Sequence, residues 1–215
     1  APRLDADPIR LVDTFDWSYS VIGNDGPVLY AVTNRDAPNR KIIAMDVRTR
    51  GPAGWRTLVP EGEHVLEGAL VAGDRLVARY LEDAKTVVRF FEKDGTPAGR
   101  LDPPGIGSIG VSGEPGDPEL YYSFTSFTYP PTIFRYDLET GESEVFREPE
   151  LTFDPGAYET RQVFFTSRDG TRVPMFVTHR KGLALDGDNP AMLYAYGGFN
   201  VSLTPGFSSS NIAFL

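Results

Sequence analysis

Residues 191–200, Ala-Met-Leu-Tyr-Ala-Tyr-Gly-Gly-Phe-Asn, combine an apolar run with a double glycine and aromatic side chains. The apolar run has the composition of a buried interior strand. The two glycines that follow free the backbone to take positive φ angles and to approach another group closely. Tyr196 lies where the predicted strand ends and the turn begins. A phenol at such a turn can donate a hydrogen bond to an oxyanion that develops during acyl transfer. Tyr196 is therefore the first candidate for a chemical role.

The other titratable candidates have weaker patterns. A catalytic histidine needs a nearby nucleophile and an orienting acid, so the sequence around His179 favours a structural or exposed role. His64 lies in a predicted solvated loop. The acidic run at residues 186–189 lacks the twelve-residue ligand spacing and the closing glutamate of a calcium loop, and it predicts a polar turn. We expect no metal site and no cofactor.

A serine nucleophile is not recognisable in the sequence. Ser208 follows Gly206 by two residues, but the second glycine of a Gly-x-Ser-x-Gly elbow is missing. Residues 208–211 could instead cap a following helix, although no convincing helical pattern is visible within the chain. We therefore expect no Ser/Asp/His triad in these 215 residues, and we expect the chain alone to be inactive as a hydrolase.

A repeat of about 45 residues organises the first two thirds of the chain. Three sets of apolar segments recur at this spacing and predict equivalent strands: residues 29–33, 76–80 and 120–124; residues 42–46, 87–91 and 133–137; residues 55–59, 99–101 and 143–146. Turn signals rich in Asn, Asp and Gly separate them. Such a period is typical of propeller blades of four antiparallel strands, and an evenly spaced β-sandwich is the alternative. Three blades do not close a ring, so we expect them to be the last blades of a larger one.

The pattern changes near residue 150. Residues 149–156 are rich in chain-breaking residues, and residues 160–166 and 173–179 then predict two strands joined by an Asp-Gly hairpin. A polar loop at residues 181–190 leads to the predicted buried strand. The sequence therefore predicts a mostly β chain with a partial propeller over residues 1–150 and a separate element over residues 151–215.

Composition excludes several classes of function. The net charge of −9 argues against nucleic-acid binding, because no basic stripe is available to displace counterions from phosphates. No apolar run approaches the roughly 18 residues of a membrane span, so we expect no membrane partner. The absence of cysteine excludes disulfides and a thiol nucleophile within the chain. These features are compatible with the cytoplasm or the periplasm and decide neither.

Several segments resemble the prolyl oligopeptidase family of serine peptidases. The resemblance runs along the whole chain, and it is most specific in Ser-Arg-Asp-Gly-Thr-Arg-Val-Pro-Met-Phe at residues 167–176 and in Leu-Tyr-Ala-Tyr-Gly-Gly-Phe-Asn-Val-Ser-Leu-Thr-Pro at residues 193–205. The family usually has glycine where this chain has Ala195. That departure puts nothing mechanistic in doubt.

The resemblance implies the last three blades of a seven-bladed β-propeller followed by the start of an α/β-hydrolase domain. It implies a serine endopeptidase that cleaves short peptides on the carboxyl side of proline. Its partners would be proline-containing peptides and the remainder of the same polypeptide. Tyr196 matches the tyrosine that stabilises the tetrahedral oxyanion, and Phe199 matches an aromatic that lines the substrate pocket.

Two alternatives remain open at this stage. A propeller-type binding module without catalysis would need only the repeats, but it would not leave the 45-residue pattern after residue 160. An oligopeptidase of different specificity would share every motif quoted above.

Overall fold

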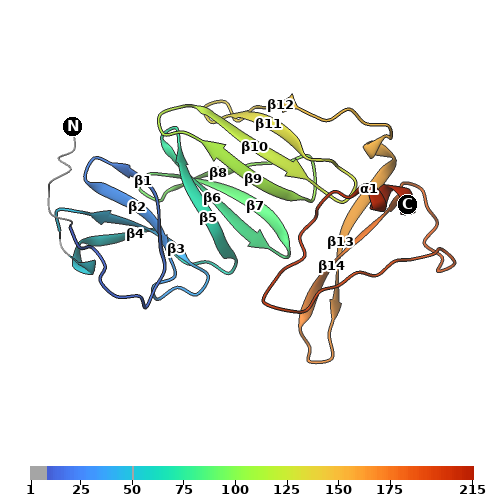
Figure 1. Cartoon of the computed structure of the whole chain (residues 1–215), viewed down its shortest axis with the longest axis horizontal. Coiled ribbons are helices and arrows are strands. Elements are labelled where there is room, and N and C mark those ends of the chain that lie inside the picture. Colours follow the sequence, from blue (N-terminus) through green and yellow to red (C-terminus); the bar gives the residue numbers. More distant parts are fainter. Residues whose placement is uncertain (1–8, 50) are drawn as a thin grey trace. The chain divides into compact units, whose positions relative to one another are not determined.

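The computed structural model describes residues 9–49 and 51–215, and it is built mainly of β-strands (Figure 1). Three four-stranded antiparallel sheets are followed by a two-stranded hairpin and a short helix. The predicted mostly β fold is confirmed. The first eight residues of the predicted propeller segment lie outside the described residues.

Each four-stranded sheet follows the chain as a meander. The first sheet has the order β1(Tyr19–Asp25), β2(Val28–Thr33), β3(Lys41–Asp46), β4(Trp55–Val59). The second has the order β5(Val65–Ala72), β6(Arg75–Glu82), β7(Lys85–Glu92), β8(Pro97–Arg100). The third contains β9(Ser108–Gly113), β10(Glu119–Thr125), β11(Thr132–Asp137), β12(Ser143–Arg147), again neighbour to neighbour. The three sets of predicted strands coincide with β2, β6 and β10, with β3, β7 and β11, and with β4, β8 and β12, so the predicted repeat is confirmed.

The chain divides into two compact units. One contains residues 1–80, 89–100 and 113–117, and the other contains residues 81–88, 101–112 and 118–215. The first unit holds the first sheet and most of the second, and the second unit holds the third sheet, the hairpin and the turn between β6 and β7. The predicted division at residue 150 follows the sequence repeat and stays a prediction.

The first unit is held by apolar side chains on both faces of its first sheet. On one face, Tyr30 and Val32 of β2 join a buried cluster that includes Leu76 and Ala78 of β6. On the other face, Ala31 packs with Ile43, Met45 and, at the margin, Trp55. Burial on both faces explains why β2 reads as a nearly continuous apolar run and not as a strict alternation.

The second unit has its core in the third sheet. Tyr122 of β10 stacks on Phe134 of β11 with ring centroids 4.8 Å apart, and its hydroxyl lies 2.7 Å from the hydroxyl of Ser143 on β12. Because Tyr122 is almost fully buried, this hydrogen bond satisfies a polar group that water does not reach.

The hairpin consists of β13(Tyr158–Thr166) and β14(Arg172–Arg180) in continuous antiparallel register. Gly170 in its turn has φ +86°, which agrees with the predicted Asp-Gly signal. The helix α1(Ser209–Phe214) follows Ser208 near the C-terminus (Figure 1). The residue after it, Leu215, is tied to the hairpin, because the Arg180 guanidinium donates to the Leu215 carbonyl oxygen at 2.7 Å. The expectation that no helix lies within the chain is therefore wrong. Six residues are too few to show a helical period. Ser208 occupies the predicted N-cap position, but its side chain makes no capping hydrogen bond.

The predicted buried strand at residues 191–196 is absent. These residues have no regular secondary structure and no strand partner, and Leu193 is 82% exposed. An interior strand is buried only where neighbouring strands pair with it, and no strand of the described part of the chain pairs with this segment. The predicted β-rich element therefore ends at Arg180.

No helix among the described residues is long and apolar enough to cross a membrane.

Gly107, just before β9, permits a close approach inside the second unit. A Cβ at this position would overlap the Phe124 ring and the Thr125 carbonyl oxygen. We predict that Gly107→Ala lowers the free energy of unfolding by about 1–3 kcal/mol, because overpacking forces a buried ring or the backbone to move. Urea denaturation measures this change. Gly105→Ala is the matched control, since a Cβ there meets nothing within 4 Å. Equal stability of the two variants would contradict the prediction.

Candidate functional site: the Tyr196 loop and its support

The candidate site is the loop formed by residues 191–204, here called the Tyr196 loop. Its centre is a turn in which the Val201 amide donates to the Gly198 carbonyl oxygen at 3.1 Å. Phe199 and Asn200 occupy the two central positions with φ +54° and +56°. Positive φ at both central residues is the geometry of a type I′ turn.

The expectation that the Gly-Gly pair takes positive φ is therefore wrong. Neither Gly197 nor Gly198 is among the residues with positive φ, and the left-handed conformation falls on the two residues after them. Asparagine tolerates this conformation well, whereas phenylalanine is strained in it. The hydrogen bond between Val201 and Gly198 makes Phe199 and Asn200 the central residues of the turn. This geometry outweighs the preference of phenylalanine for negative φ.

Tyr196 and Phe199 both project from this loop. Tyr196 is 48% exposed, and its ring folds back over the turn, so that a Cβ on Gly198 would lie 3.3 Å from the tyrosine hydroxyl. A side chain at residue 198 would come into close contact with the Tyr196 hydroxyl, and glycine avoids this contact. Phe199 is 93% exposed. The loop therefore presents a phenol donor and an aromatic ring three residues apart, next to solvent.

Within the described chain, residues 184–204 form hydrogen bonds only with residues close in sequence. Asn189 donates to the Ala184 carbonyl oxygen at 2.6 Å, and the Asp188 amide donates to Asp186 at 3.1 Å. These bonds agree with the predicted polar turn at residues 186–189. No group of three or more His, Cys, Asp or Glu side chains that could hold a metal lies among the described residues.

Residues 205–207, which follow the Tyr196 loop, contact the third sheet. Pro205 is fully buried, and its carbonyl oxygen accepts a hydrogen bond from the Ser108 hydroxyl at 2.6 Å. The Phe207 amide donates to the Thr125 hydroxyl oxygen at 3.3 Å. Sequence reasoning missed Ser108 and Thr125, because a hydroxyl residue at a strand end carries no local signal of a distant partner.

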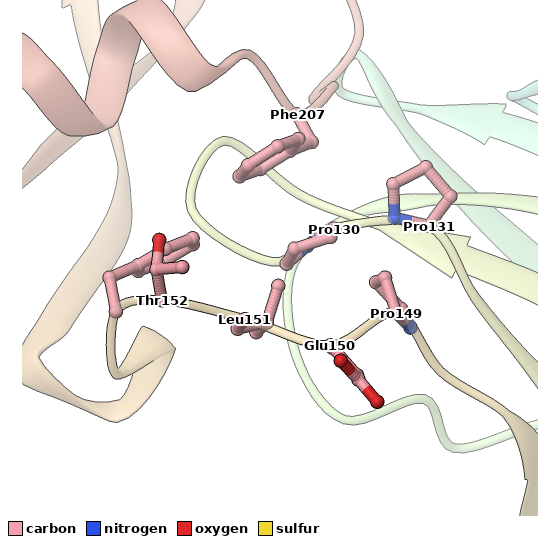
Figure 2. A pocket seen from close by; sticks show the side chains of 8 residues that line it. Pro130, Pro131, Pro149, Glu150, Leu151, Thr152 and Phe207 are labelled. Atoms are coloured by element: carbon pink, nitrogen blue, oxygen red, sulfur yellow. The ribbon is translucent and has the colours of Figure 1, made fainter.

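A shallow pocket of about 510 Å³ lies beside this anchored segment (Figure 2). Phe207 lines it from one side, and the segment that leaves the third sheet lines it from the other. The lining is mostly apolar and contains Pro130, Pro131, Pro149, Glu150, Leu151, Thr152, Phe153 and Phe207. The Phe207 and Phe153 rings are stacked with centroids 6.0 Å apart. Neither Tyr196 nor Phe199 lines this pocket.

His179 has a structural position, which agrees with the sequence interpretation. It is 5% exposed on β14, and its Nδ1 lies 2.8 Å from the Arg180 carbonyl oxygen. Its Nε2 lies 3.6 Å from a carboxylate oxygen of Glu159, the residue directly opposite on β13. His179 therefore faces its cross-strand partner inside the hairpin, and its Nε2 is buried without a hydrogen-bond partner in the described part of the chain.

Comparison with known proteins agrees with this architecture. A family model described as the N-terminal β-propeller domain of prolyl oligopeptidase matches residues 2–149. The prolyl endopeptidase of Elizabethkingia meningoseptica is 40% identical over 206 residues, which are 95% of this chain and 29% of that protein. The chain thus spans less than a third of the length of this relative.

Two solved structures extend the comparison. One, from a study of two prolyl endopeptidases, superposes with a TM-score of 0.83 at 42% identity and covers 94% of this chain and 29% of that chain. The other is prolyl oligopeptidase B from Galerina marginata bound to a 35-residue hydrolysis and macrocyclization substrate. It superposes with a TM-score of 0.81 at 31% identity, over 92% of this chain and 28% of that one.

The family match covers the three four-stranded sheets, which are accordingly blades of a β-propeller. The high-coverage relatives continue past the blades through the hairpin and into the Tyr196 loop. The chain belongs to the prolyl oligopeptidase family.

Proposed function

We propose that this chain is part of a serine endopeptidase that cleaves short peptides on the carboxyl side of proline. Its membership of the prolyl oligopeptidase family carries the proposal, together with 40% identity to a protein named prolyl endopeptidase. Residues 1–150 contribute blades of a propeller that restricts access to the active site. Residues 151–215 begin the catalytic α/β-hydrolase domain. The Ser/Asp/His triad comes from the remainder of the same polypeptide.

Tyr196 stabilises the oxyanion in this proposal. When a serine oxygen attacks the peptide carbonyl, negative charge develops on the carbonyl oxygen, and hydrogen-bond donors already aimed at that position lower the barrier. The Tyr196 hydroxyl acts as one donor, and a backbone N–H next to the nucleophile acts as the other. The half-exposed phenol at a turn supports this role, because a donor must reach the substrate and not be consumed in the protein core.

Phe199 lines the substrate pocket near the residues that precede the scissile bond. Its ring is almost fully exposed, so burying it against a peptide substrate would remove apolar surface from water. A peptide as partner is supported by the related oligopeptidase that was solved with a 35-residue peptide substrate. A catalytically inert binding module would not need the segment after residue 160.

We predict that Tyr196→Phe in the catalytically complete polypeptide lowers kcat by about 10²–10³-fold, the effect of losing one oxyanion donor. A hydrogen bond made only in the transition state lowers kcat and kcat/KM together, with KM little changed. Steady-state kinetics on a chromogenic peptide with proline before the scissile bond measure both constants.

Thermal unfolding of the same variant is the control. A tyrosine with a purely structural role would lose about 1 kcal/mol of stability with its hydroxyl and would keep its turnover. Tyr194→Phe removes a hydroxyl from a neighbouring exposed tyrosine of the same loop and is expected to keep kcat. An unchanged kcat in Tyr196→Phe would refute the proposed role.

We predict that Phe199→Ala acts mainly through KM. A pocket aromatic contacts the substrate and the transition state alike, so its loss weakens both to a similar extent and leaves kcat nearly unchanged. Kinetics on the same chromogenic peptide test this. A fall in kcat with constant KM would instead place Phe199 in the catalytic step.

We predict that the 215-residue chain alone hydrolyses no proline-containing peptide. Removing a triad member from a serine peptidase leaves only a small residual rate, and an oxyanion donor does not replace the nucleophile. A chromogenic assay of the purified chain tests this, with a serine-directed inhibitor as control. Inhibitor-sensitive turnover would show that a nucleophile within the 215 residues had been overlooked.

A further inference from the structure

The third blade holds the chain directly after the Tyr196 loop at two points. Ser108, the first residue of β9, donates to the Pro205 carbonyl oxygen at 2.6 Å. Thr125, the last residue of β10, accepts from the Phe207 amide at 3.3 Å. We call this pair of contacts the Ser108/Thr125 clamp. Both contacts are to backbone atoms, so the clamp fixes the path of the chain.

The Thr125 hydroxyl is oriented for this task. It donates its one proton to the Tyr129 carbonyl oxygen at 3.0 Å. Its oxygen lone pairs are therefore left to accept from Phe207. The anchored residues are further held by the burial of Pro205 and by the stacking of Phe207 on Phe153, whose ring planes differ by 4°.

The clamp limits where the Tyr196 turn can lie. The turn is closed by the hydrogen bond between Val201 and Gly198, and only residues 202–204 separate Val201 from Pro205. Four residue steps of extended chain span at most about 14 Å. Since residues 184–204 form only local hydrogen bonds within the described chain, the clamp is the nearest fixed point after Tyr196.

We propose that Ser108 and Thr125 are positioning residues for Tyr196: propeller side chains that hold Pro205 and Phe207 and thereby set the position of the oxyanion donor. The inference rests on the proposed role of Tyr196. It makes the third blade a support of the catalytic step as well as a wall around the active site. The hydroxyls touch no substrate and act through the backbone of the loop.

The first test measures the clamp without using activity. Ser108→Ala and Thr125→Val, made in the catalytically complete polypeptide, should accelerate hydrogen exchange in peptides that cover residues 197–207. Thr125→Ser keeps the hydroxyl and should restore slow exchange. Ser112→Ala and Ser123→Ala remove hydroxyls from exposed positions of β9 and β10 and are the matched controls. Equal exchange in the clamp variants and the controls would overturn the proposal.

The second test measures the coupling to Tyr196. Ser108→Ala should lower kcat by about tenfold with little change in KM, and a misplacement of about 1 Å is known to cost up to ~10²-fold. The same substitution in a Tyr196→Phe background should lower kcat no further, because the donor that it positions is already gone. An equal loss in both backgrounds would overturn the positioning role.

The two tests separate failure of the inference from failure of the proposed function. If Tyr196→Phe keeps full kcat, the oxyanion role is wrong and the positioning role fails with it, whatever the exchange data show. If Tyr196→Phe loses kcat but Ser108→Ala and Thr125→Val do not, the oxyanion role stands and the positioning role alone is overturned. Accelerated exchange, a kcat loss in both clamp variants and no further loss in the Tyr196→Phe background together support the inference.

Discussion

The close approach at Gly107 is the constraint on which the organisation of the second unit depends. Without a Cβ, this residue lets the start of β9 lie against the Phe124 ring and the Thr125 carbonyl at the end of β10. Two strand ends that are neighbours in the sheet are thereby held tightly together. Their adjacent hydroxyl residues, Ser108 and Thr125, then reach two positions in the returning chain that are only two residues apart. A larger residue at 107 would separate the strand ends and with them the two points of the clamp.

Residues 83–86, in the turn between β6 and β7 and at the start of β7, also form hydrogen bonds that support this region. The Thr86 amide donates to the Gly107 carbonyl oxygen at 3.1 Å. Lys85, the first residue of β7, donates to the Gln162 side-chain oxygen at 2.8 Å, and the Gln162 side-chain amide donates back to the carbonyl oxygen of Asp83 in the preceding turn at 2.5 Å. The third blade and the hairpin therefore share one hydrogen-bonded support within the second unit. The Tyr196 loop lies in the chain between this hairpin and the clamp, and loops positioned by a rigid scaffold often carry binding residues.

The strands of the blades could be predicted from the sequence because each strand pairs with the next one along the chain. The alternation of apolar residues and the turn residues between the strands therefore indicate the strand positions. The sequence did not predict the conformation of segments whose burial or position depends on residues far away in the chain. Residues 191–196 have the composition of a buried strand, but burial depends on strands that must pair with them. Positive φ angles were expected at Gly197 and Gly198 but occur at Phe199 and Asn200, because the hydrogen bond from Val201 to Gly198 makes these two residues the centre of the turn. Tyr196 was proposed from its place before a double-glycine turn and from motif resemblance, and Phe199 from the resemblance. Ser108 and Thr125 are recognised only through contacts between distant parts of the chain.

The backbone at Phe199 is a physical reason to regard this loop as more than a connection. A left-handed conformation costs an ordinary residue about 1–2 kcal/mol, whereas glycine adopts it freely. Stability alone would favour glycine or asparagine at residue 199, and asparagine does occupy the next position, where φ is also positive. The phenylalanine ring, which is 93% exposed, recovers none of this cost by packing within the described chain. Backbone strain that is not offset by packing of the side chain is typical of binding sites and active sites, where the side chain contacts a partner. The positive φ at Phe199 and the anchoring of Pro205 thus agree with the proposed role of this turn in binding a peptide substrate.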